Sequence, residues 1–387
     1  MPDLYKQTDI ELVINNLLNL VRIQDHAGDT REIAALYEQL LTEVGFNVET
    51  YEFIPNNPTL IGRFQGNTNP DGKKLIFNGH MDVIPLDHRA PFVKDGKVYG
   101  RGTCDMKGSL ACILEAARML HASRDAINGE WIVIANSMHE SPGGRGEDLY
   151  ALAEKIDLKA DAAIVMEGAT SDCTIAQMGS ATFHIVVERE GDPSHQLFTP
   201  IETPHPIHVM ADVIHALELE NKYLNQQAIE DIGYASYFIG HIQSGSFYNQ
   251  MPKYASVEGV RRYGPDDDFD AVKHQMEERL ATIADKHGVR IHLELTKVRD
   301  GYRIAKDHPL VTALQQSVKQ VTKVEIPLTG KKLVTDAGIF VKEMGIPTVC
   351  HGPDQRTAHG EIEYVEISEL EKTINIYVQF IHEFFKA

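Results

Sequence analysis

Three apolar segments in the first half of the chain each lead into a side chain that can ligate a metal ion. They have the composition of buried strands and cover residues 74–77, 131–135 and 161–166. The ligand-capable side chains that follow them are His80, Glu140 and Glu167. Since the carboxyl ends of neighbouring parallel strands meet at one edge of a sheet, we expect these side chains to lie close together. The chain is therefore predicted to form an α/β sheet with a functional site at that edge.

Two aspartates extend this candidate site. Asp82 lies two residues after His80, a spacing at which its carboxylate can orient a metal-bound imidazole. Asp105 lies in the glycine-rich segment 100–108, just before a helix that we predict over residues 109–123. This position fits two interpretations, a metal ligand and an N-terminal helix cap, and the sequence alone leaves both open.

The order of predicted elements changes near residue 179. The elements that follow are a strand at 182–188, a helix at 207–218, strands at 234–244 and 255–261, a helix at 269–287 and a strand at 289–298. The order β-α-β-β-α-β is that of a compact ferredoxin-like α+β domain. After Gly301 the strand–helix alternation of the first part resumes. We therefore predict a discontinuous first domain, residues 1–178 and 297–387, with a second domain inserted at 179–296.

Length, charge and cysteine content restrict the class of protein. A chain of 387 residues exceeds one ordinary core, which favours two domains. The 37 basic and 56 acidic residues give a formal net charge of −19, which argues against nucleic acid and anionic membrane surfaces as partners. No apolar run is long enough to span a bilayer. The four cysteines form no Cys-x-x-Cys pattern, so we expect reduced, buried thiols in a cytoplasmic protein.

A series of short motifs spans most of the chain. The motifs are Gly79-His80-Met81-Asp82-Val83, Gly100-Arg101-Gly102, Asp105-Met106-Lys107-Gly108, Glu167-Gly168, Asn249-x-x-Pro252, Arg262-x-x-Pro265, Thr335-Asp336-Ala337, Gly345-Ile346-Pro347, Gly352-Pro353 and His359 with Glu363-Tyr364-Val365. Their order and content resemble the M20 family of metallopeptidases, which includes acetylornithine deacetylase and succinyl-diaminopimelate desuccinylase. The resemblance implies a zinc-peptidase-like catalytic domain, with a mixed sheet flanked by helices, that is split by a lid or dimerisation domain.

The resemblance also implies two divalent metal ions, with zinc expected and cobalt or manganese as alternatives. The implied ligands are His80, Asp105 and Glu167 for one ion, and Asp105, Glu140 and His359 for the other. Asp105 would thus bridge the two ions, and Asp82 would hold the ring of His80. Histidine and carboxylate ligands without cysteine are typical of sites that keep open positions for catalysis, whereas structural zinc sites favour cysteine.

The chain departs from the family pattern at one position. The family has Asp-Glu-Glu, where the first glutamate is the general base and the second a metal ligand, but this chain has Met138-His139-Glu140-Ser141. Counting along the apolar strand makes His139 the base and Glu140 the ligand. Alignment on Gly143 instead makes Glu140 the base and Ser141 the ligand. We favour the first frame because it keeps the ligand set complete and because histidine can exchange a proton near neutral pH.

Three residues of the second domain match positions that contact substrate in the family. His195 lies about where relatives have a lid histidine that reaches the partner subunit's site and stabilises an oxyanion. A plain surface histidine is the alternative. Asn249 and Arg262 match positions that bind a substrate carboxylate, a group for which the guanidinium fork is suited. Arg261 is adjacent, and a slip of one residue would exchange the two arginines. The resemblance also implies a homodimer.

These observations predict a metal-dependent amidohydrolase. Its substrate would be an N-acyl amino acid or a small peptide, and metal-activated water would cleave the amide bond. Because His139 replaces the usual glutamate, an alternative remains open. That alternative is a catalytically altered relative that binds a small carboxylate ligand without efficient turnover.

Overall fold

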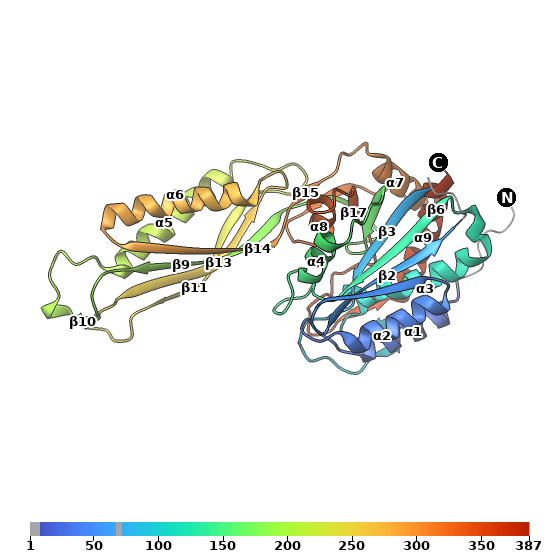
Figure 1. Ribbon diagram of the computed structural model, residues 1–387, viewed down its shortest axis with the longest axis horizontal. Coiled ribbons are helices and arrows are strands. Elements are labelled where there is room, and N and C mark those ends of the chain that lie inside the picture. Colours follow the sequence, from blue (N-terminus) through green and yellow to red (C-terminus); the bar gives the residue numbers. More distant parts are fainter. Residues whose placement is uncertain (1–7, 67–71, 387) are drawn as a thin grey trace. The chain divides into compact units, whose positions relative to one another are not determined.

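The computed structural model describes residues 8–66 and 72–386 of the chain. The chain divides into two compact units (Figure 1). The first contains Met1–Ile175, Ile304–Thr329 and Thr335–Ala387, and the second contains Ala176–Arg303 and Gly330–Val334.

The first unit is built on a mixed sheet. Its strands, in spatial order, are β1 (Asn47–Ile54), β2 (Asn57–Gln65), β6 (Gly129–Asn136), β3 (Lys73–His80), β7 (Ala162–Val165), β17 (Thr348–Cys350) and β8 (Cys173–Gln177). The central strands β6, β3, β7 and β17 are parallel, whereas β1 and β2 run antiparallel to their neighbours. Two short strands, β15 (Tyr302–Arg303) and β16 (Leu328–Lys331), pair with β8. A separate small sheet contains β4 (Phe92–Lys94), β5 (Lys97–Tyr99) and β18 (Tyr364–Glu366).

The central strands are apolar without alternation. Leu75, Ile76 and Phe77 of β3 have no exposed surface, and neither do residues 131–135 of β6. Continuous burial of this kind is typical of parallel strands that are covered on both faces. The three strands expected from their apolar runs are thus confirmed as β3, β6 and β7.

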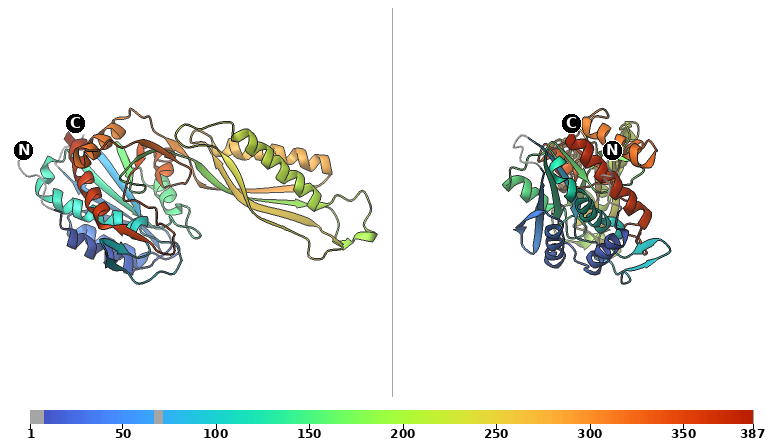
Figure 2. Two further views of the ribbon diagram at one scale, coloured as in Figure 1. Left: turned by 180° about the vertical axis from the view of Figure 1, so that it is seen from behind. Right: turned by 90° about the vertical axis from the view of Figure 1, so that its right-hand side faces the viewer.

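Helices cover this sheet. They are α1 (Ile10–Arg22), α2 (Arg31–Glu43), α3 (Gly108–Leu120), α4 (Glu147–Lys155), α7 (Pro309–Thr322), α8 (Ala337–Lys342) and α9 (Ile367–Lys386), with the short helices η1 (Thr103–Lys107) and η2 (His121–Ala126). Helix α3 packs against α1 and α9, as the view from behind in Figure 2 also shows. Every residue of α3 except Arg118 is buried, which makes α3 a core helix. Within residues 8–66 and 72–386, no helix has the length and hydropathy needed to cross a bilayer.

The second unit is a four-stranded antiparallel sheet with two helices on one face. The strands, in spatial order, are β11 (Ser236–Ser244), β13 (Tyr254–Tyr263), β9 (Gly179–Glu188) and β14 (Arg290–Arg299). Helices α5 (Pro206–Leu224) and α6 (Phe269–His287) lie on the same side of this sheet (Figures 1 and 2). Alternate residues of β9, Phe183, Ile185 and Val187, face the core that these helices share. The unit also carries a short η3 (Gln196–Phe198) and the pair β10 (Ser194–His195) and β12 (Gln250–Met251). The predicted α/β fold with an added α+β domain is thus confirmed.

Candidate metal centre

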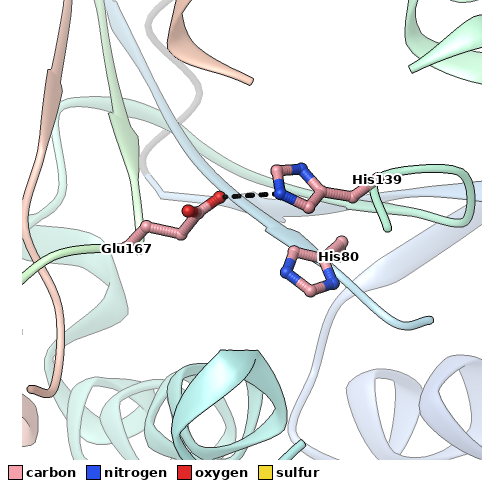
Figure 3. Close-up of side chains that lie close together, drawn as sticks. All are labelled: His80, His139 and Glu167. Atoms are coloured by element: carbon pink, nitrogen blue, oxygen red, sulfur yellow. Dashed lines mark ion pairs between the residues drawn. The ribbon is translucent and has the colours of Figure 1, made fainter. Parts of the chain in front are cut away.

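The predicted ligands of the first unit gather where its parallel strands end. His80 is the last residue of β3, and Glu167 follows β7 by two residues. His139 and Glu140 lie in the loop after β6. Since β6, β3 and β7 are neighbours in the sheet, His139, His80 and Glu167 come together from three strand ends, as Figure 3 shows.

His80 lies between two aspartates. Its Nε2 atom is 3.2 Å from Oδ1 of Asp105. Its Nδ1 atom is 3.0 Å from the backbone oxygen of Asp82 and 3.4 Å from the carboxylate of that residue. The carboxylate of Asp82 also accepts a hydrogen bond from the amide of Glu140 at 2.8 Å. Asp82 therefore holds both the ring of His80 and the loop that carries Glu140.

Asp105 does not cap the following helix. It has extended backbone angles, and the N-cap of α3 is Lys107, which makes no side-chain capping bond. The helix-cap interpretation of Asp105 is therefore wrong. The two oxygens of its carboxylate instead face different histidines, because Oδ1 contacts His80 and Oδ2 lies 3.3 Å from Nε2 of His359.

Glu140 completes this group. Its Oε1 atom lies 3.0 Å from Nε2 of His359, whereas Ser141 is exposed. His80, Asp105 and Glu140 each offer a ligand atom within 4.8 Å of the other two. Glu140, the ligand of the first reading frame, therefore lies within this group, and that frame stays a prediction.

His139 stacks on the ring of His80. The two imidazole rings are nearly parallel, at 5°, with centroids 4.2 Å apart. Nε2 of His139 lies 3.7 Å from Oε1 of Glu167, an ion-pair contact that Figure 3 marks. Its Nδ1 atom lies 3.0 Å from Oδ2 of Asp336, a contact that lacks the alignment of a hydrogen bond.

The electrostatics of the group favour a cation. Burial raises the pKa of Asp105, but its hydrogen bonds to His359 and His80 outweigh burial and lower it. Hydrogen bonds to Asp105 and Glu140 raise the pKa of His359 to about 10. Burial lowers the pKa of His139, but Asp336 and Glu167 outweigh burial and raise it to about 9. The carboxylates thus stabilise positive charge at this edge of the sheet.

Glu167 provides a direct test of fit to a metal ion. Burial raises the pKa of its carboxyl to about 7. Its Oε1 atom is buried and accepts no hydrogen bond from any residue in the described ranges 8–66 and 72–386. A buried carboxylate oxygen without a donor costs free energy, and a bound cation would remove that cost. The residues present therefore fit a divalent ion.

Two supporting side chains were not expected from the sequence. Glu363 accepts hydrogen bonds from the amides of Cys104 and Asp105, at 3.1 and 3.2 Å. Gln355 donates to Oδ1 of Asp105 at 3.0 Å. The only available signal for Glu363 was its place in the motif after His359, since 258 residues separate it from Asp105.

The three predicted substrate contacts lie in the second unit. His195 and Asn249 are in contact, with Nδ2 of Asn249 3.2 Å from Nε2 of His195. Arg262 lies on β13, and its Nη1 atom is buried without a hydrogen-bond partner in the described part of the chain. The guanidinium of Arg261, by contrast, lies 4.5 Å from the ring of Tyr237.

Comparison with known proteins agrees with this geometry. Residues 76–383 match the family model described as peptidase family M20/M25/M40. The chain is 26% identical to N-formyl-4-amino-5-aminomethyl-2-methylpyrimidine deformylase of Bacillus subtilis, with 92% of this chain and 89% of the relative covered. It is 27% identical to succinyl-diaminopimelate desuccinylase of Methylibium petroleiphilum, with 89% and 90% covered.

A solved structure has the same fold. It is a dinuclear metal-binding M20 peptidase of Bacillus subtilis, with a TM-score of 0.73, 16% identity and 97% of this chain and 98% of that chain covered. The resemblance drawn from the motifs is thus confirmed. This chain belongs to peptidase family M20/M25/M40, a family of hydrolases that act on amide and peptide bonds.

Proposed function

We propose that this protein is a di-metal amidohydrolase that cleaves the amide bond of an N-acyl amino acid or a small peptide. The observation that carries this proposal is the carboxylate of Asp105, whose two oxygens face His80 and His359. A carboxylate placed in this way can bridge two ions. The names of the deformylase and desuccinylase relatives support removal of an acyl group from nitrogen. No comparison supports the alternative of a relative that binds without turnover.

The proposed ligand sets are those expected from the sequence. His80, Asp105 and Glu167 would hold one ion, and Asp105, Glu140 and His359 the other. Bound divalent ions supply Lewis acidity toward the substrate carbonyl and lower the pKa of water. Zinc is the proposed metal because the donors are imidazole and carboxylate, with cobalt or manganese as alternatives.

We assign His139 the role of general base and not that of a ligand. His80, His139 and Glu167 also form a close group of potential ligands. The two ligand sets given above would hold both ions without His139, whose ring instead stacks on that of His80. In its neutral form, His139 would take a proton from the attacking water and give it to the leaving amine.

The second unit would serve dimerisation and substrate recognition. Its edge strand β11 exposes 66% of Phe238 and 57% of Ile242, an apolar surface suited to a second copy of the chain. We propose a homodimer in which His195 reaches the partner's site.

The second unit would also bind a carboxylate of the substrate. The Nη1 atom of Arg262, which is buried and has no hydrogen-bond partner in the described part of the chain, supports this role. Asn249 matches another family position that binds a substrate carboxylate. We further propose a cytoplasmic location, which the four buried free cysteines support.

Turnover of a substrate panel tests the function. Purified protein is freed of metal with a chelator, reloaded with zinc, cobalt or manganese, and assayed against N-formyl, N-acetyl and N-succinyl amino acids and dipeptides. We expect hydrolysis of at least one class that depends on added metal. Metal binding with no hydrolysis across the panel would contradict the proposal.

Paired variants test the role of His139. His139→Ala should leave metal content unchanged and lower kcat by a factor on the order of 10² to 10⁴, because only proton transfer is lost. Glu140→Ala should lower metal occupancy first and activity as a consequence. If His139→Ala keeps full turnover while Glu140→Ala keeps both ions but loses catalysis, Glu140 is the base and the other frame is right.

A further inference from the structure

We propose that Asp336 is the positioning residue for His139, so that a carboxylate–histidine pair replaces the single carboxylate base of the family pattern. This inference rests on the proposed role of His139 as the general base. Asp336 lies in the Thr335-Asp336-Ala337 motif.

Asp336 is fixed in place by the sheet. Its carboxylate is buried, with 1% of its side chain exposed. Oδ2 accepts a hydrogen bond from Nδ2 of Asn136 at 2.8 Å, and Oδ1 of Asn136 in turn accepts one from Asn78 at 2.9 Å. Asn136 and Asn78 lie on the neighbouring strands β6 and β3. The carboxylate is therefore tied to the two strands whose ends carry His139 and His80.

The same oxygen of Asp336 faces the ring of His139. Oδ2 lies 3.0 Å from Nδ1, so a proton on Nδ1 would face the carboxylate, although the two groups are not aligned as a hydrogen bond in this structure. The other nitrogen, Nε2, then points toward Glu167, at 3.7 Å, and thus toward the candidate metal ligands. Stacking on His80 fixes the plane of the ring. One carboxylate thus selects the tautomer in which Nε2 can accept a proton.

This arrangement suits a histidine base. Histidine becomes positively charged when it takes a proton, and the carboxylate of Asp336 would stabilise that charge.

In the proposed hydrolysis, one proton passes from water through His139 to the leaving amine. As water attacks the carbonyl carbon, a C–O bond forms, the π pair of the C=O bond moves to the carbonyl oxygen, and one O–H bond of the water breaks with its proton moving to Nε2 of His139. The C=O bond then re-forms as the C–N bond breaks, and Nε2 gives its proton to the leaving amine. The step needs no co-reactant.

A double-mutant cycle tests the proposal. Asp336→Asn keeps the shape of the side chain and an oxygen for Asn136, but it removes the charge. In the protein that keeps His139, we expect Asp336→Asn to lower kcat roughly 10- to 100-fold, as is typical when a carboxylate that orients a histidine is lost. KM and metal content should stay unchanged. In the His139→Ala background the same substitution should have no further effect on the residual rate, because Asp336 acts through His139.

The outcomes separate this proposal from the proposed function. An equal loss in both backgrounds would mean that Asp336 only supports the fold, and would overturn the proposal. If His139→Ala abolishes turnover but Asp336→Asn does not lower it, His139 stands as the base and Asp336 does not position it. If His139→Ala keeps full turnover, the base assignment itself fails. The exposed-loop variant Arg356→Gln serves as a control and should behave like the parent protein.

A second readout does not depend on activity. Ring ¹⁵N shifts of labelled histidine report which nitrogen carries the proton. In the metal-loaded protein we expect a signal for His139, assigned by its absence in His139→Ala, from the tautomer protonated at Nδ1. This population should fall in Asp336→Ala, which removes the oxygen that faces Nδ1. An unchanged tautomer in that variant would contradict the positioning role.

Discussion

Glu363 illustrates how one buried carboxylate can hold the backbone that carries a candidate ligand. It accepts hydrogen bonds from three amides of the segment 102–105, and its Oε2 atom lies 3.1 Å from Nη1 of Arg101. Arg101 and Glu363 are both buried, so the charge of each depends on the other. Glu363, near the C-terminal end of the sequence, therefore helps to fix the backbone position of Asp105.

Glu363→Gln should weaken both the fold and the candidate site. The amide nitrogen of glutamine cannot accept a hydrogen bond, so backbone donors lose a partner, and Arg101 loses its counter-charge. We expect the free energy of unfolding to fall by about 1 to 3 kcal/mol, and metal affinity to fall roughly 10- to 100-fold. Chemical denaturation and competition with a chelator measure the two effects. Glu361→Gln, at an exposed position nearby, should change neither.

At the scale of elements, Asp148 connects helix α4 to strand β2 and to the loop after strand β6. This residue of α4 is buried, and its Oδ2 atom accepts hydrogen bonds from the hydroxyl of Thr59 on β2 and from the amide of Ser137 after β6, at 2.8 and 2.7 Å. Burial raises the pKa of its carboxyl to about 7. The contacts hold the loop that leads to His139.

Asp148 should make the stability of the protein depend on pH. Its pKa is about 7 in the fold against an ordinary value of 3.8, so between these values the folded state binds more protons than the unfolded state. Stability is therefore greatest below about pH 4 for this group and falls as the pH rises toward about 7. Asp148→Asn removes this contribution. Measured in a chelator, the free energy of unfolding of the variant relative to the parent should increase from pH 4.5 to pH 8. An equal difference at both pH values would contradict the shift.

For the whole molecule, the sequence reveals elements better than it reveals distant contacts. Strands β3, β6 and β7 could be predicted because continuous apolar runs leave a clear pattern. The contact between His139 and Asp336 could not, because a single pair of polar side chains almost 200 residues apart leaves no periodic trace. The same holds for Glu363 and Asp105. The candidate ligands could be proposed because each follows a strand or lies in a motif. Glu363 and Asp336 lie in motifs too, but a motif does not reveal which distant residue each of them contacts.

The proposed homodimer is also testable at this scale. Sedimentation equilibrium should give the mass of two chains. Phe238→Asp places a charge on the exposed edge strand β11 and should yield monomers with much reduced turnover, because His195 would no longer reach a partner's site. Val324→Asp is a control, since it changes an equally exposed apolar residue of the first unit. A monomer with full activity would rule out the role of His195 in the partner's site.

Metal content is the most direct test of the central claim that Asp105 bridges two ions. The protein loaded with zinc and freed of excess metal should contain about two ions per chain by elemental analysis. Asp105→Ala should lose most of both, because each ion loses a ligand, whereas Glu140→Ala should retain one ion with His80 and Glu167. Two ions retained in Asp105→Ala would contradict the bridging role, and a single ion in the parent protein would contradict the dinuclear site.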